Sequence, residues 1–168
     1  EVEKICSGED GVTVIQGARH VLFQTAQTLL VCRRLEGEFL NYRNAIPRNN
    51  SIQIECDARK LLQSIERVSL IISEKLKSPL RCVFGDGIVS ITTKTGIGDA
   101  ADQCSIEGDG QGLEIGFNNK YLMDALKAAP AEKLRMEFSS GVAPCVILPA
   151  EEDDSFIYMV LPVRLKAN

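Results

Sequence analysis

The order strand, capped helix, strands occurs twice in residues 51–168, and this repeat constrains the fold more than any other feature. The first copy begins with the β-rich Ser51–Cys56, followed by Asp57, a residue type favoured at helix N-caps. The second copy begins with Gly112–Phe117, followed by Asn118. One copy alone cannot bury both its helix and its sheet face. We therefore expect the two copies to pack as one α+β domain of two βαβββ units, with antiparallel sheets.

Both expected helices carry an apolar stripe at helical spacing. The first spans residues 57–73, and the second spans 118–129 and ends before Pro130. The stripe of the first helix consists of Leu61, Leu62, Ile65, Val68 and Ile72. The stripe of the second consists of Tyr121, Leu122, Ala125, Leu126 and Ala129. We expect both stripes to face the sheets.

The remaining strands of the repeat are marked by β-rich segments and turn residues. Arg81–Lys94 predicts a hairpin that turns at Gly85-Asp86-Gly87, and a further strand is expected near Gln103–Ile106. Three more strands are expected at Lys133–Phe138, Val142–Pro149 and Phe156–Val163, with an exposed acidic loop at residues 150–155.

The start of the chain predicts a separate, incomplete sheet. Gly11–Gly17, His20–Ala26 and Thr28–Leu35 are short β-rich segments divided by turn residues, whereas residues 36–50 are polar and break the pattern. We therefore divide the chain into a partial domain at 1–46, a linker at 47–50 and a complete domain at 51–168. Since Glu1 is not a methionine, we expect the chain to be a fragment of a longer protein.

Charge and cysteine content exclude several kinds of site. A net charge of −4 argues against tight, salt-driven wrapping of nucleic acid, although it allows a protein that holds DNA by topology. The six cysteines include no CxxC pair, so we expect reduced thiols in a cytosolic protein and no metal. We expect Cys56, Cys82 and Cys145 to lie in the core. No segment has the length of a membrane span or the order of a signal peptide.

Catalytic chemistry has little support in the sequence. His20 is the only histidine, and no phosphate-binding glycine loop or HExxH motif occurs. Glu151-Glu152 and Asp153-Asp154 are consecutive residues in a loop, a pattern typical of solvated charges rather than of a general acid and base.

The end of the chain raises a question about burial. Phe156–Val160 reads as a buried strand, but Pro162 cannot donate to a sheet ladder and so belongs at an edge or strand end. Leu161 and Val163 would then lie near the surface, beside Arg164. Two interpretations remain open: a wall of a groove for a partner's peptide, or an ordinary terminal strand with a frayed end. The residues alone favour the second.

Four motifs together resemble the bacterial DNA polymerase III β subunit family, the sliding clamps. They are EGEFLNYR followed by AIP, then IGFNNKYLMDAL, then RMEFSSGVAPCVILP, and finally YMVLPVRL, and they occur in the family's order. The resemblance implies the DNA-clamp fold, with helices on an inner face and sheets outside. It also implies that residues 1–46 are the end of a middle domain and 51–168 a third domain.

The same resemblance implies a function without catalysis or a cofactor. A clamp is a cytoplasmic processivity factor of DNA replication that forms a homodimeric ring around duplex DNA of any sequence. It tethers the polymerase III catalytic subunit, and it also binds clamp-loader subunits and other proteins that carry the clamp-binding motif. We expect DNA-facing cations on the two helices, namely Arg59, Lys60, Arg67, Lys120 and Lys127. Ordinary helices of soluble proteins also carry basic residues on their exposed faces. The interpretation that these five side chains are solvated and do not contact DNA therefore stays open.

The resemblance also implies a peptide groove and a subunit interface. The groove would comprise Met159, Leu161, Pro162, Val163, Arg164, Leu165, Val142, Asn118, Tyr121, Leu40 and Ala45. The interface would comprise Leu70, Ile71, Asp99 and Asp102. Leu70 and Ile71 fit an interface because they extend the first helix beyond its core stripe, but they would equally fit a cap over the core.

Two other function classes remain as alternatives. One is an enzyme that acts on a small molecule in a cleft, with His20 or a cysteine in that cleft. The other is a protein-interaction domain with no role on DNA, in which the five helix cations would be scattered in space. A clamp would show an apolar groove without a nucleophile and base.

Overall fold

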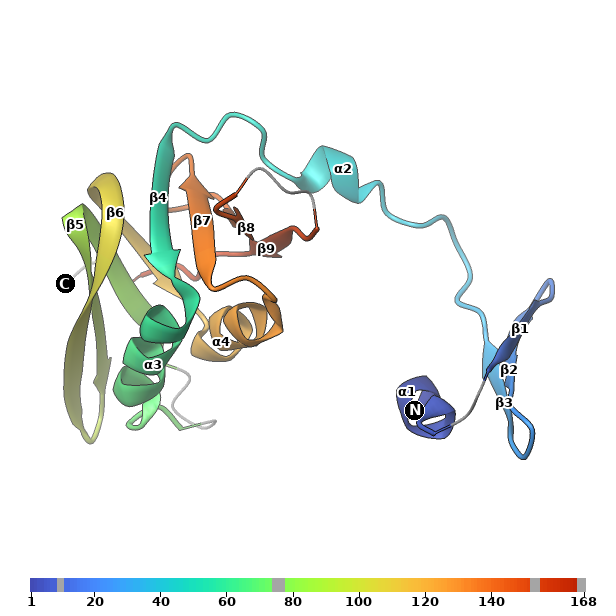
Figure 1. Ribbon diagram of the computed structural model, residues 1–168. Helices are drawn as coiled ribbons and strands as arrows, with labels where there is room; N and C mark the ends of the chain where they lie inside the picture. Colours follow the sequence, from blue (N-terminus) through green and yellow to red (C-terminus); the bar gives the residue numbers. More distant parts are fainter. Residues whose placement is uncertain (9–10, 74–77, 152–154, 166–168) are drawn as a thin grey trace. The chain divides into compact units, whose positions relative to one another are not determined.

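The computed structural model describes residues 1–8, 11–73, 78–151 and 155–165, and these form two compact units, residues 1–41 and 42–168. The first unit contains helix α1 (Val2–Cys6) and an antiparallel sheet in the order β1-β2-β3 (Figure 1). Its strands are β1 (Thr13–Gln16), β2 (His20–Gln24) and β3 (Leu29–Arg33). Val14, Leu29 and Val31 are each more than half exposed, so this unit has little core of its own.

The second unit is a six-stranded antiparallel sheet with two helices, in the strand order β5-β6-β4-β7-β8-β9. The short helix α2 (Tyr42–Ala45) precedes it. The strands are β4 (Ile52–Asp57), β5 (Leu80–Thr95), β6 (Gly98–Phe117), β7 (Lys133–Phe138), β8 (Cys145–Pro149) and β9 (Tyr158–Val160). The helices are α3 (Ala58–Ser69) and α4 (Asn119–Ala128), which lie side by side (Figure 1).

Both predicted helix caps are confirmed. The Asp57 carboxylate accepts a 2.9 Å hydrogen bond from the Lys60 N–H, and the Asn118 side chain accepts a 3.0 Å bond from the Lys120 N–H. Each bond satisfies a backbone donor that the first helical turn leaves free. The predicted stripes are buried at Leu61, Ile65, Val68, Leu122 and Leu126.

Two details of the helix predictions are wrong. The helix α3 ends at Ser69 rather than at residue 73, although Ile72 still packs against the core. The side chain of Tyr121 is 63% exposed and does not belong to the buried stripe of α4.

The predicted hairpin at Gly85-Asp86-Gly87 is also wrong. β5 continues through these residues, and its register against β6 shifts on both sides of Asp86, as at a β-bulge. Phe84 and Val89, on either side of the bulge, are both buried, so β5 packs against the core before and after it. The chain instead reverses between Thr95 and Gly98, and β6 then joins the two strands that were expected separately near Gln103–Ile106 and Gly112–Phe117.

The predicted strands at the C-terminal end are longer than the observed ones. β8 begins at Cys145 instead of Val142, and β9 covers only Tyr158–Val160 of the expected Phe156–Val163. Past β9 the chain pairs with a different strand, through a bridge between Pro162 and Phe117 at the end of β6. The expected acidic loop has Glu151 and Ser155 exposed, while residues 152–154 lie outside the described part of the chain.

The core lies between the helices and the strands of the second unit. Phe84 and Phe138 meet there with ring centroids 4.8 Å apart. The predicted burial of Cys56, Cys82 and Cys145 is confirmed, and Cys104 is buried too.

Candidate functional site

A groove of about 540 Å³ lies between α4 and the chain that runs from β9 to residue 163. We call it the α4 groove, and its lining residues are Asn118, Tyr121, Asp124, Ala125, Ile157, Tyr158, Met159, Val160, Leu161, Pro162 and Val163. A larger pocket of about 800 Å³ lies beside the first turn of α4 and shares Asn118, Tyr121 and Val163 with the groove.

Two hydrogen bonds hold β9 and the C-terminal segment, residues 161–165, beside the two ends of α4. At the C-terminal end of α4, the Tyr158 hydroxyl donates a 3.0 Å hydrogen bond to the carbonyl of Ala128. Just before the N-terminal end of α4, the Val163 N–H donates a 2.8 Å bond to the carbonyl of Gly116 in β6. The groove is therefore fixed at both ends of the helix.

The α4 groove presents apolar side chains to solvent. Leu161 and Tyr121 are both 63% exposed, and Met159 is 39% exposed. A partner that covered these side chains would remove apolar area from water, which contributes roughly 1.5–3 kcal/mol for each aliphatic side chain that becomes fully buried. Among the described residues of the lining, Asp124 is the one with a charged side chain. Such a surface suits a short, extended peptide with apolar side chains.

The structure brings six of the eleven predicted groove residues together in the lining. They are Asn118, Tyr121, Met159, Leu161, Pro162 and Val163. Arg164 and Leu165 follow directly in the chain, with Arg164 exposed and Leu165 half-buried. The remaining three are not in the lining: Val142 is 81% exposed in the loop between β7 and β8, and Ala45 ends α2. Leu40 belongs to the first compact unit, which is described by itself.

Five lining residues were missed by the sequence reasoning, namely Asp124, Ala125, Ile157, Tyr158 and Val160. Helical spacing could have found two of them, because Asp124 and Ala125 lie three and four residues after Tyr121 and so share its side of the helix. No comparable signal exists for Tyr158, since its place depends on a bond to a distant part of the chain.

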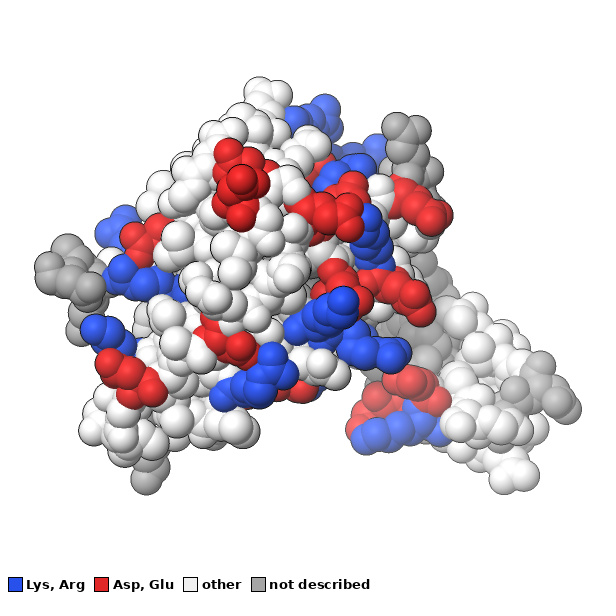
Figure 2. All heavy atoms as spheres, turned by 60° about the vertical axis from the view of Figure 1, so that its left-hand side comes forward, with Lys and Arg blue, Asp and Glu red and all other residues white. Residues whose placement is uncertain are grey.

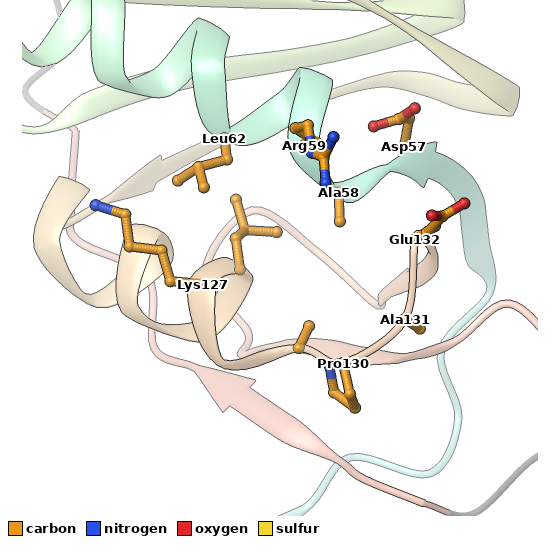
Figure 3. A pocket seen from close by; sticks show the side chains of 10 residues that line it. Asp57, Ala58, Arg59, Leu62, Lys127, Pro130, Ala131 and Glu132 are labelled. Carbon is orange, nitrogen blue, oxygen red and sulfur yellow. The ribbon is translucent and has the colours of Figure 1, made fainter.

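The predicted DNA-facing cations are only partly gathered. Arg59 from α3 and Lys127 from α4 line one further pocket of about 540 Å³, and Figure 3 shows each of them on its own helix. Lys60 is exposed next to Arg59 in the first turn of α3. Lys120 lies at the other end of α4, in the pocket beside the groove.

Two of these cations pair with carboxylates of the same chain. Lys127 lies 2.9 Å from a carboxylate oxygen of Glu66, which links α4 to α3. Arg67 lies 2.7 Å from Asp102 in β6. On the face shown in Figure 2, acidic and basic side chains likewise lie next to one another. Such a surface favours weak contacts with phosphates over strong ones.

Asp102 has a pKa below its ordinary value because opposing effects do not cancel. Partial burial raises the pKa of this carboxyl. The Gln103 N–H and the Arg67 guanidinium bind the charged form, and together they lower the pKa by more than burial raises it. Of the other predicted interface residues, Leu70 is 83% exposed directly after α3, Ile71 is half-buried, and Asp99 is exposed in β6.

The enzyme alternative placed His20 or a cysteine in a cleft. Neither a histidine nor a cysteine lines the α4 groove or the pocket beside it. Burial raises the pKa of Cys56 and of Cys82 to about 12, which keeps both thiols protonated and poorly nucleophilic. Among the described residues, no group of three or more histidine, cysteine or acidic side chains could hold a metal.

No helix within the described ranges is long and apolar enough to cross a membrane.

Comparison with known proteins gives one consistent result. Residues 43–164 match the family model described as DNA polymerase III beta subunit, C-terminal domain. The beta sliding clamp of Staphylococcus aureus is 30% identical over 167 residues, which cover 98% of this chain and 44% of the relative. The beta sliding clamp of Synechocystis is 30% identical over 175 residues, which cover 98% of this chain and 43% of that relative.

A solved structure agrees with these relatives. The DNA polymerase sliding clamp of Pseudomonas aeruginosa superposes with a TM-score of 0.84 and 27% identity, over 96% of this chain and 44% of that one. The chain thus spans less than half the length of the clamps it matches. The expected clamp fold is confirmed, and the chain belongs to the DNA polymerase III beta subunit family, whose C-terminal domain corresponds to residues 43–164.

Proposed function

We propose that this chain is the C-terminal part of a sliding clamp and that the α4 groove binds short linear motifs of replication proteins. The single observation that carries the proposal is the exposed apolar lining of the groove. Leu161 and Tyr121 are each 63% exposed from opposite sides, on elements that are fixed to each other. The partners would be the polymerase III catalytic subunit, clamp-loader subunits and other proteins that carry such a motif.

Peptide binding in this groove would supply processivity because it would attach the polymerase to the clamp. A polymerase attached to a clamp stays at a high effective concentration near its template, so each local dissociation is followed by rebinding. The groove needs apolar residues for affinity and polar groups for direction. Leu161, Pro162 and Val163 would supply the apolar contacts, and Asn118 and the exposed Arg164 would supply the polar ones.

The test is fluorescence polarisation with a labelled peptide that contains a Gln-Leu-x-Leu-Phe motif. The unchanged chain is compared with the double variant Leu161→Ala/Arg164→Ala. The matched control is Ile97→Ala/Lys94→Ala, which also removes one exposed aliphatic side chain and one cation, but at the β5–β6 turn. We expect the groove variant to bind at least tenfold more weakly, or about 1.4 kcal/mol, and the control to bind within twofold of the unchanged chain.

If the chain binds no peptide, the experiment is repeated with the full-length protein, because in this proposal residues 1–46 would be only part of a middle domain. Absence of saturable binding there would reject the groove as a motif-binding site. Equal loss in both double variants would place the binding surface elsewhere.

We further propose that the full-length protein forms a homodimeric ring around duplex DNA of any sequence. The relatives are named sliding clamps, and the helix pair α3 and α4 offers Arg59 and Lys127 at one pocket together with the exposed Lys60. Because Lys127 and Arg67 are also paired with carboxylates, the phosphate contacts would be few and weak, which suits sliding. Leu70, Ile71, Asp99 and Asp102 are the residues proposed for the subunit interface.

Topology gives the test of the ring. Full-length protein loaded by a clamp loader should remain on nicked circular DNA through gel filtration, and linearising that DNA should release it. Retention on linear DNA would contradict a sliding ring. In this proposal the protein is a cytoplasmic, non-catalytic subunit of the polymerase holoenzyme and uses no cofactor.

A further inference from the structure

Gly116 in β6 lies directly beneath the C-terminal segment and has no space for a side chain. A Cβ atom at this position would clash with the carbonyl oxygen of Val163, and it would lie 2.8 Å and 2.9 Å from two side-chain carbons of Leu165. Contacts this short do not occur for real Cβ atoms, and one of them is to backbone, which cannot swing aside as a side chain can. Gly116 itself is buried and does not line the α4 groove.

The backbone of the same strand end holds the segment in place. The Gly116 carbonyl accepts the 2.8 Å hydrogen bond from the Val163 N–H, and Phe117 forms a β-bridge with Pro162. Since Pro162 has no N–H, it cannot donate a backbone hydrogen bond to β6. The segment is therefore attached to β6 by close backbone contact over a short stretch, and a displacement at Gly116 would be passed on to its neighbours along the segment.

Those neighbours are the groove wall. Leu161, Pro162 and Val163 face α4, and Asn118, two residues after Gly116, starts that helix. Gly116 thus lies in the end of β6 that contacts the groove wall and leads directly into α4.

We propose that Gly116 is a positioning residue for peptide binding: the missing side chain lets residues 161–165 lie flat on β6 and so fixes the separation of the groove wall from Tyr121. This inference rests on the proposed peptide-binding function of the α4 groove. A methyl group at Gly116 would push Val163 and Leu165 away from β6, and with them the wall that the peptide contacts.

Gly110, on the same strand, provides a matched control. It is also buried, and a Cβ there would clash with Phe84, with the carbonyl carbon of that residue 2.7 Å away. The clash would therefore separate β6 from β5, which contributes no residue to the α4 groove. Gly110→Ala and Gly116→Ala should both lower the thermal midpoint, but only the second should affect the peptide.

The experiment measures peptide affinity by fluorescence polarisation for the unchanged chain and both variants, at a temperature where circular dichroism shows all three folded. We expect Gly116→Ala to weaken binding at least tenfold and Gly110→Ala to leave it within twofold. The inference is overturned if Gly116→Ala binds within twofold of the unchanged chain, or if both variants lose affinity equally.

A second measurement separates this inference from the proposed function. Hydrogen exchange of the Val163 amide should accelerate at least tenfold in Gly116→Ala and stay unchanged in Gly110→Ala. If the unchanged chain and the full-length protein bind no peptide, the proposed function fails, while the exchange rate still reports whether Gly116 positions the segment. Unchanged exchange would overturn the positioning role.

A third variant covers the case in which Gly116→Ala does not fold. In Gly116→Ala/Leu165→Ala the two Leu165 carbons that would contact the new Cβ are gone, and the clash with the Val163 carbonyl remains. We expect this variant to bind more weakly than Leu165→Ala alone by at least threefold. Equal affinities of the two would overturn the inference.

Discussion

The Tyr158 hydroxyl donates a 3.0 Å hydrogen bond to the Ala128 carbonyl, and this bond joins β9 to the C-terminal end of α4. The carbonyl is one of the last four of the helix, which have no partner within the helix itself. The ring of Tyr158 also stacks on Phe156, with centroids 5.1 Å apart. Both walls of the α4 groove are thus connected by one side chain.

Tyr158→Phe should lower the free energy of unfolding by about 0.5–1.5 kcal/mol, the typical net value of one hydrogen bond. The ring and its stacking on Phe156 are kept, so the change isolates the hydroxyl. Urea denaturation followed by circular dichroism measures it. Tyr121→Phe is the control, because the Tyr121 side chain is 63% exposed and its hydroxyl has no hydrogen bond to any residue that the structure describes. Equal losses in the two variants would show that the Ala128 bond does not stabilise the fold.

Asp124 gives the α4 groove a preference for the charge of its ligand. A carboxylate in the lining repels an acidic peptide side chain and attracts a basic one. Asp124→Asn should therefore strengthen the binding of an acidic-flanked motif and weaken that of a basic-flanked motif, each by about two- to fivefold at low salt, as for an exposed charge pair. Fluorescence polarisation with the two peptides at two salt concentrations measures this. Shifts in the same direction for both peptides would contradict an electrostatic cause.

The Arg67–Asp102 ion pair makes part of the stability depend on pH. The pKa of Asp102 is lowered in the folded chain, so its contribution is complete above the ordinary value of 3.8 and disappears as the pH falls through the lowered pKa. The thermal midpoint of Asp102→Asn should therefore lie below that of the unchanged chain at pH 7, and the difference should shrink below about pH 4. We expect the ion pair to contribute less than about 1 kcal/mol to the free energy of unfolding, because the Arg67 side chain is 58% exposed.

The asparagine variant is suited to this comparison because it keeps a side-chain oxygen for the Gln103 N–H, which donates a 2.8 Å bond to Asp102. A difference in midpoint that is constant from pH 7 to pH 3 would exclude the charge of Asp102 as its source.

The six free cysteines should react in two classes. Cys6 and Cys32 are half-buried, whereas Cys56, Cys82, Cys104 and Cys145 are buried, and burial raises the pKa of all four. Because the thiolate is the reactive species, an aromatic disulfide reagent should label two thiols quickly in the folded chain and six in denaturant. Rapid labelling of four or more without denaturant would contradict the buried core.

Local features of the sequence predicted the elements that depend on near neighbours in the chain. The caps Asp57 and Asn118 mark the starts of both helices, and the spacing of Leu61, Ile65 and Val68 gives the buried stripe of α3. Caps and stripes act over three or four residues, so a single sequence carries them. The motifs at residues 115–126 and 158–165 are also short stretches of consecutive residues, and their resemblance to the clamp family could be seen in the sequence alone.

Turn residues were a weaker guide, because glycine serves bulges as well as turns. Gly85-Asp86-Gly87 has the composition of a hairpin, yet it forms a bulge in β5. Whether such a segment reverses or only bends is decided by the strand opposite it.

The groove itself was decided by the tertiary structure. By sequence alone, Leu161-Pro162-Val163 favours a frayed strand end. In the fold, the Gly116 carbonyl binds the Val163 N–H and the Tyr158 hydroxyl reaches Ala128, so the last strand and α4 form two walls with their apolar side chains exposed. The sequence determined which residues are apolar and where the helices begin. Only long-range backbone pairing could place those residues opposite one another, because that pairing joins strands that are far apart in the chain.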